Sequence, residues 1–133
     1  MNIALISHDN KKELMLDFCI AYKGILENHN LFATWSTGSF IIEGAGLDVY
    51  RYSSGALGGE QLMARIALNE IDMVISLRDP SALSEYEHDW NSVLRHCDMQ
   101  NIPVATNIAT AELLIKGLER GDLSWRELVN PSI

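Results

Sequence analysis

Short apolar runs alternate with segments of helical periodicity from one end of this chain to the other. Five of the runs have the length and apolar content of strands buried in a sheet, namely residues 2–7, 31–36, 49–52, 72–77 and 102–106. The segments between them repeat apolar side chains at helical spacing. Strands that alternate with helices through right-handed crossovers predict an α/β fold with a doubly wound parallel sheet of about five strands.

Length and charge restrict the class of protein further. The chain has 133 residues, which fits a single domain covering residues 1–133. Its net charge of −8 argues against a nucleic acid partner, because a phosphate backbone needs clustered Lys and Arg. No apolar run approaches the roughly 20 residues that cross a bilayer, so we expect a cytoplasmic protein with no membrane partner. Cys19 and Cys97 lack C-x-x-C spacing, which predicts two buried free thiols.

The helical segments have recognisable start and stop residues. Asp9 or Asn10 is expected to cap a first helix that ends at the turn over residues 28–30. Further helices are expected over residues 37–43, 61–69, 89–100 and 107–121. Residues 81–88 form the longest stretch without clear periodicity, which predicts a loop or lid near the site. Trp125 is expected to pack a short C-terminal turn against the core.

The segment Ser53-Ser54-Gly55-Ala56-Leu57-Gly58-Gly59-Glu60 lies between the third apolar run and a helical pattern. A glycine-rich turn at a helix start points backbone N–H groups at its occupant, and the helix terminus adds partial positive charge. Such a turn predicts a binding site for an anion. Glu60 is expected in the first turn of this helix, where a carboxylate is either a capping or dipole partner or a base beside a bound substrate.

Two other strand-to-helix junctions carry similar chemistry. They are Ser7-His8-Asp9-Asn10-Lys11-Lys12 and Thr34-Trp35-Ser36-Thr37-Gly38. In an open α/β sheet such junctions gather at the carboxyl ends of the strands. We therefore expect three polar loops to converge on one site.

These junctions, together with Arg78-Asp79-Pro80 and Asn101-Ile102-Pro103-Val104-Ala105-Thr106-Asn107, resemble the motifs of the methylglyoxal synthase family. The likeness extends from residue 1 to about residue 129. It implies a small flavodoxin-like fold assembled as a homohexamer. It also implies an enzyme that uses no metal or organic cofactor. In the family a carboxylate removes a carbon-bound proton from dihydroxyacetone phosphate, an enediolate forms, and phosphate is expelled to leave methylglyoxal.

The resemblance assigns roles to residues of matching type. The residues expected to hold the phosphate are Lys12, Thr34, Ser36, Thr37, Ser54 and Gly55. His8 and Asp9 match the family's first catalytic loop, and Asp9 is also expected to contact the ligand. Asp79 and Asp89 match acidic residues of the family's active site. His8, Asp9 and Asp79 lack metal-ligand spacing, so no metal is expected.

The sequence departs from the family where the chemistry takes place. Glu60 occupies the position of the aspartate base, and its extra methylene can shift the carboxylate by about 1 Å, which costs about a hundredfold in rate. Tyr86 replaces a histidine, and a phenol with a pKa of about 10 is a poor proton shuttle at neutral pH; His88 could substitute only if its loop shifts. Trp35 replaces a glycine, which narrows the space for a triose but offers a flat ring a stacking platform.

Three functions follow from this pattern. The departures favour a binding protein that senses or sequesters a small phosphorylated ligand, such as a nucleotide or nucleotide-like molecule, with catalysis weakened or lost. The alternative is an active methylglyoxal synthase that uses Glu60 as its base together with His8. The third is a structural or regulatory subunit that joins a hexamer of a true synthase.

Overall fold

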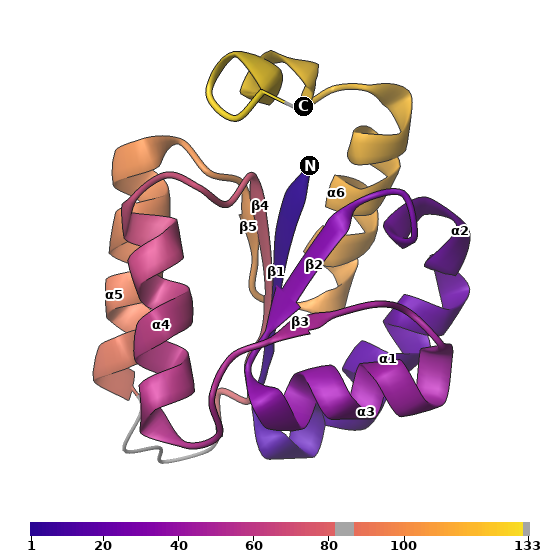
Figure 1. Cartoon of the computed structure of the whole chain (residues 1–133), viewed down its shortest axis with the longest axis vertical. Coiled ribbons are helices and arrows are strands. Elements are labelled where there is room, and N and C mark those ends of the chain that lie inside the picture. The colour runs from indigo at the N-terminus through magenta and orange to yellow at the C-terminus, as the bar shows by residue number, and fades with distance from the viewer. Residues whose placement is uncertain (82–86, 132–133) are drawn as a thin grey trace.

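The computed structural model describes residues 1–81 and 87–131, with the backbone alone described for residues 87–90. Its strands form a five-stranded sheet in the order β3-β2-β1-β4-β5 (Figure 1). Their bounds are β1 Asn2–Ser7, β2 Asn30–Ala33, β3 Tyr50–Arg51, β4 Met73–Leu77 and β5 Val104–Ala105. All four neighbouring pairs are parallel. The predicted flavodoxin-like, doubly wound α/β class is confirmed.

Helices cover both faces of this sheet. Their bounds are η1 Asp9–Lys11, α1 Lys12–Ala21, α2 Lys23–Leu26, α3 Trp35–Ala45, α4 Ala56–Ala67, α5 Glu87–Gln100, α6 Ile108–Arg120 and η2 Ser124–Leu128. In Figure 1, α4 and α5 lie on one side of the sheet, while α1, α3 and α6 lie on the other. Among the described residues, no helix has both the length and the apolarity needed to cross a membrane.

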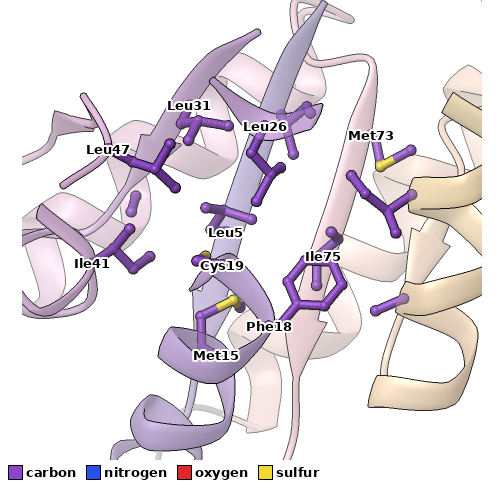
Figure 2. Close-up of a cluster of buried hydrophobic side chains, with 14 of the residues drawn as sticks. Leu5, Met15, Phe18, Cys19, Leu26, Leu31, Ile41, Leu47, Met73 and Ile75 are labelled. Atoms are coloured by element: carbon purple, nitrogen blue, oxygen red, sulfur yellow. The ribbon is translucent and has the colours of Figure 1, made fainter. Parts of the chain in front are cut away.

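The alternation of side chains along each strand produces two apolar layers, because successive residues of a strand point to opposite faces. Ile3 and Leu5 of β1 join the larger layer, which α1, α2, α3 and α6 complete (Figure 2). Ala4 joins the smaller layer beneath α4 and α5. Cys19 lies in the first layer and Cys97 in the second, and both are buried free thiols as predicted. Burial raises the pKa of each thiol to about 12.

The strand order places a reversal of winding beside β1. The chain proceeds from β1 to β2 and β3 on one side, then crosses through α4 to β4 on the other side of β1. In open α/β sheets, ligands bind outside the carboxyl ends of the strands at such a reversal. The fold therefore predicts a ligand site at the loops that follow β1, β2 and β3.

The helices that follow β2 and β3 begin earlier than the sequence predicts. The second strand was expected to reach Ser36, but β2 ends at Ala33 and α3 begins at Trp35, because Thr34 is extended and already acts as the helix N-cap. Likewise α4 begins at Ala56 rather than at residue 61. Of the glycines in this segment only Gly55 has a positive φ, at 75°, and Gly58 and Gly59 are part of the helix.

The first helix also differs from its prediction. A turn of 3-10 helix, η1, precedes α1, and the chain breaks at Tyr22 before α2. The expected side-chain cap at Asp9 or Asn10 is wrong, because among the described residues no side chain caps η1 or α1. By contrast, Asn107 is the N-cap of α6, and its Oδ1 accepts a hydrogen bond from the Thr110 N–H at 3.1 Å.

The C-terminal turn presents a different residue to the core than expected. Trp125 is 46% exposed, whereas its neighbour Arg126 is 1% exposed. Arg126 Nε donates to Asp72 Oδ1 at 3.2 Å, and its Nη2 donates to Asn69 Oδ1 and to the Ile71 carbonyl, each at 2.8 Å. The prediction for Trp125 is therefore wrong, because Arg126 occupies the inward position and supplies polar partners for Asp72.

Candidate functional site

A pocket of about 530 Å³ lies at the carboxyl ends of the strands, a volume typical of sites for small molecules. Its lining comes from the loops after β1, β2 and β3 and from the facing side of α4 and α5. The lining residues are Ile6, Ser7, His8, Asp9, Asn10, Lys12, Thr34, Trp35, Ser36, Thr37, Ser54, Gly55, Ala56, Gly59, Leu62, Met63 and Val93. The expected convergence of three polar loops is confirmed.

Most of the residues expected to contact a ligand share this pocket. Those that line it are His8, Asp9, Lys12, Thr34, Trp35, Ser36, Thr37, Ser54 and Gly55. They come from three separate segments between residues 8 and 55, and the parallel sheet brings these segments together. Their presence in one hollow is an observation; the roles that the resemblance gives them stay predictions.

The start of α3 forms one wall of the pocket. The Gly38 N–H bonds the Thr34 carbonyl at 2.9 Å, which makes Gly38 the first residue to donate within the helix. The N–H groups of residues 35–37 precede that bond, and within the described chain no side chain caps this terminus. The hydroxyls of Ser7 and Thr37 lie 3.2 Å apart beside it. This wall therefore offers backbone donors and hydroxyls to an anion.

The start of α4 forms the opposite wall. Gly55 is its N-cap, and here too no side chain of the described residues supplies a cap. Gly58 has a structural reason to be glycine, because a Cβ at this position would lie 1.8 Å from the Ser53 carbonyl oxygen. A second helix of at least three turns thus directs its N-terminus to the pocket at Ser54 and Gly55.

Lys12 supplies positive charge between these walls. Its Nζ lies 2.8 Å from Asp9 Oδ1 and donates a hydrogen bond to Ser36 Oγ. The Lys12 side chain is 19% exposed and that of Asp9 is 96% exposed. The hydrogen bond and the charge of Lys12 lower the pKa of Asp9, and His8 contributes further to this shift. The cation of the pocket is therefore paired with a carboxylate of the same loop.

The His8 ring is oriented from the neighbouring strand end. Its Nδ1 accepts a hydrogen bond from the Asp79 N–H at 2.8 Å. An accepting Nδ1 carries no proton, so the proton of the neutral ring resides on Nε2. The Asp79 carboxylate accepts hydrogen bonds from the Ser81 hydroxyl and N–H and from Asn10 Nδ2. These bonds lower the Asp79 pKa to about 2.

Trp35 lines the pocket, is 45% exposed and stacks against a cationic side chain. The Arg51 guanidinium carbon is 3.9 Å from the indole centroid, and Arg51 Nη1 donates to Ser39 Oγ at 2.9 Å. The Arg51 stem lies over Gly38, where a Cβ would come within 2.6 Å of Arg51 Cγ. Trp35 is therefore held as part of the wall and does not fill the hollow.

The remaining predicted catalytic residues are placed differently. Glu60 is exposed and does not line the pocket, although its neighbour Gly59 does. Asp79 does not line the pocket either and contacts it through His8 and Asn10. Tyr86, and the side chain of Asp89, lie outside the described residues. Within the described part of the chain, no group of three or more His, Cys, Asp or Glu side chains could hold a metal ion.

An apolar floor is the part of the site that sequence reasoning missed. Ile6, Leu62, Met63 and Val93 line it from β1, α4 and α5. Leu62 and Met63 belong to the apolar stripe of α4, a stripe that equally well indicates a core face. The stripe extends into the site because α4 begins at Ala56, earlier than the sequence predicts.

The fold and the pocket define a class of protein: a small doubly wound α/β domain in which two helix N-termini, hydroxyls and one lysine line a single pocket. The family model described as "MGS-like domain" matches residues 15–106. The chain is 62% identical over 134 residues to the methylglyoxal synthase of Caldicellulosiruptor saccharolyticus, covering 100% of this chain and 95% of that protein. It belongs to the methylglyoxal synthase family.

Two further similarities agree with this assignment. The methylglyoxal synthase of Listeria welshimeri is 56% identical over 129 residues, which cover 96% of each chain. A crystal structure of methylglyoxal synthase from Elizabethkingia anophelis matches with a TM-score of 0.79 and 38% identity, covering 86% of this chain and 76% of that chain. Because these relatives are named as synthases, the comparisons favour the active-enzyme alternative over the binding-only prediction.

Proposed function

We propose that this protein is an active methylglyoxal synthase that converts dihydroxyacetone phosphate to methylglyoxal and inorganic phosphate. The observation that carries the proposal is the convergence of the family's phosphate-binding residue types in one pocket. Two helix N-termini and one lysine surround a volume suited to a small molecule. The full-length similarity to named synthases supports the same reaction.

Some pocket residues bind the phosphoryl group of the substrate, and others stabilise the charge that develops during proton transfer. Lys12, Ser36, Thr37 and the amides at Ser54 and Gly55 hold the phosphoryl group. His8 donates from Nε2 to the carbonyl oxygen and stabilises the negative charge that develops when the enediolate forms. The hydrogen bond from Asp79 to Nδ1 fixes the tautomer that makes this donation possible.

Glu60 acts as the base that removes the carbon-bound proton. It lies on α4 directly after the pocket residue Gly59, and its exposed side chain can change rotamer to approach the substrate. The electron pair of the C–H bond passes to the carbonyl oxygen as the enediolate. Its collapse, with loss of the hydroxyl proton, breaks the bond between carbon and the phosphate oxygen, and phosphate leaves with the electron pair. The methylene carbon of the resulting enolate then takes up a proton to give methylglyoxal, and Glu60 returns to its carboxylate form.

Kinetics of paired lysine variants test the binding part of this proposal. Lys12→Met removes the charge that faces the phosphoryl group and is expected to lower kcat/KM for dihydroxyacetone phosphate by a factor of about 10 to 100, because a charge-assisted hydrogen bond is lost. Lys23→Met, on α2 and outside the pocket lining, is the matched control and is expected to change kcat/KM less than twofold. Equal effects of the two substitutions would contradict the assignment.

A second candidate function has two observations in its favour. Glu60, the residue at the position of the family's base, does not line the pocket, and Trp35 does. A protein that binds a phosphorylated ring compound without turning it over would fit both facts. In that case the purified protein gives no methylglyoxal, Glu60→Asp combined with Tyr86→His restores turnover, and native mass spectrometry finds a nucleotide that co-purifies.

We further propose, following the resemblance, that residues 1–133 form a single domain that assembles as a homohexamer in the cytoplasm. Native mass spectrometry of the purified protein is expected to give one species of six chains. If instead the chain enters mixed oligomers with a true synthase and shows neither turnover nor a bound ligand, it serves as a structural or regulatory subunit.

A further inference from the structure

The pocket contains a carboxylate where a phosphoryl group should bind. Lys12 is the one lysine or arginine among the described residues that line the pocket, and its Nζ is 2.8 Å from Asp9 Oδ1. Asp9 also lines the pocket. Its carboxylate offers the same chemistry as one edge of a phosphate: oxygens that accept hydrogen bonds from a cation.

The two partners are held very differently. Lys12 is fixed at the start of α1, is 19% exposed and also donates to Ser36 Oγ. The Asp9 side chain is 96% exposed, and its i,i+3 position relative to Lys12 is the geometry of a solvent-facing helical pair. Exposed pairs of this kind are weak. Asp9 can therefore leave Lys12 without disturbing a packed environment, whereas Lys12 stays in place.

We propose that Asp9 is an internal competitor for Lys12 that sets the affinity of the site for phosphoryl groups. A phosphoryl oxygen takes the place of Asp9 Oδ1 on Lys12 Nζ, and Asp9 turns to solvent. This inference rests on the proposed phosphate site but adds a function for a residue that the resemblance assigns to ligand contact.

The exchange has a defined effect on the reaction. Because every phosphoryl group must first displace Asp9 from Lys12, the ion pair weakens the binding of substrate and of released inorganic phosphate by the same factor. Uniform weakening raises KM without changing the chemical step. It also keeps the product from occupying the site. Removing the competitor should therefore lower KM for the substrate and the inhibition constant of phosphate in parallel.

Isothermal titration with inorganic phosphate and inhibition kinetics with dihydroxyacetone phosphate test this exchange. Asp9→Asn keeps the shape of the side chain and removes its charge. We expect phosphate to bind this variant about three- to fivefold more tightly, the range expected for an exposed ion pair, with a matching fall in KM. Asp17→Asn, farther along α1 and exposed, removes the same charge away from Lys12 and is expected to change both constants by less than 1.5-fold.

A double-mutant cycle separates exchange on Lys12 from a general effect of negative charge. In a Lys12→Met background the Asp9→Asn substitution is expected to have no effect on phosphate affinity. The inference is wrong if Asp9→Asn leaves phosphate affinity unchanged, or if its effect is equally large without Lys12. If neither the wild type nor Asp9→Asn binds phosphate, the proposed phosphate site itself is wrong. If both proteins bind phosphate with equal affinity, the site stands and only the role of Asp9 is wrong.

Discussion

At the scale of single residues, the site depends on hydrogen bonds that orient side chains from neighbouring strand ends. His8 follows β1 and Asp79 follows β4, and the parallel pairing of these strands brings the Asp79 N–H to the His8 ring. The sequence motif supplied both residues, but not the bond that fixes the ring. That bond joins residues 71 positions apart in the sequence and depends on the register between β1 and β4.

Asp79 gives a prediction of pH dependence at this scale. Its hydrogen bonds from Ser81 and Asn10 lower its pKa from an ordinary value of 3.8 to about 2. A carboxyl group whose pKa is lower in the folded state than in the unfolded chain stabilises the folded state at pH values above its unfolded pKa. This contribution is lost as the pH falls from about 4 to about 2. A carbon-13 NMR titration should therefore place the midpoint of Asp79 near 2 in the native protein.

Variants of the donors provide the control. Ser81→Ala and Asn10→Ala each remove one donor and should move the Asp79 midpoint upward, with the larger effect from Ser81 because its hydroxyl makes the largest contribution. A wild-type midpoint near 3.8, or no response to either substitution, would show that these bonds do not form in solution.

At the scale of elements, the start of α4 determines the shape of the site. The glycine pattern over residues 53–60 indicated an anion-binding turn, and the pocket contains Ser54 and Gly55 as expected. The pattern did not indicate that Gly58 and Gly59 are helical, because glycine has low helix propensity. Within the helix, the absence of a side chain at Gly58 leaves room for the Ser53 carbonyl oxygen, which would lie 1.8 Å from a Cβ at this position.

The two glycines of α4 should respond in opposite ways to alanine. A Cβ at Gly58 would meet the Ser53 carbonyl oxygen at 1.8 Å, so Gly58→Ala must displace the turn and should destabilise the protein by about 1–3 kcal/mol. A Cβ at Gly59 meets nothing within 4 Å, so Gly59→Ala should be neutral or stabilise by up to about 1 kcal/mol. Urea unfolding measures both, and equal changes would contradict this account of the turn.

The accuracy of the sequence-based prediction differs from element to element for physical reasons. The two central strands were located well, since β1 agrees at both ends and β4 begins one residue later than predicted. The helix starts after β2 and β3 were misplaced because Thr34 and Gly55 act through backbone conformation, which many residue types can adopt. The polar site residues were found through motifs. The apolar floor was missed because the apolar residues of α4 have the same spacing as a helix face that packs in the core.

At the scale of the whole molecule, a buried ion pair joins the C-terminal turn to the amino ends of the strands. Asp72 Oδ2 accepts from the Asn2 N–H at 2.8 Å, while its Oδ1 accepts from Arg126 and from Asn130 Nδ2. This network lies at the opposite end of the sheet from the pocket, as the positions of the N- and C-termini in Figure 1 indicate. It should therefore affect stability more than catalysis.

Arg126→Ala tests this separation. Removing the arginine leaves Asp72 buried without its cation, which should lower the free energy of unfolding by about 3–5 kcal/mol. Arg120→Ala breaks the exposed pair with Asp122 and should cost no more than about 1 kcal/mol. At a temperature where Arg126→Ala remains folded, its KM should match that of the wild type. A stable variant with a changed KM would contradict the separation.

The central claim, that this pocket turns over a triose phosphate rather than only holding one, is tested most directly by following purified protein with dihydroxyacetone phosphate by proton and phosphorus NMR. The account predicts that methylglyoxal and inorganic phosphate appear in equal amounts, at a turnover within the ordinary enzyme range of about 1 to 1,000 per second. Dihydroxyacetone phosphate that stays intact while its phosphorus signal shows binding would contradict it.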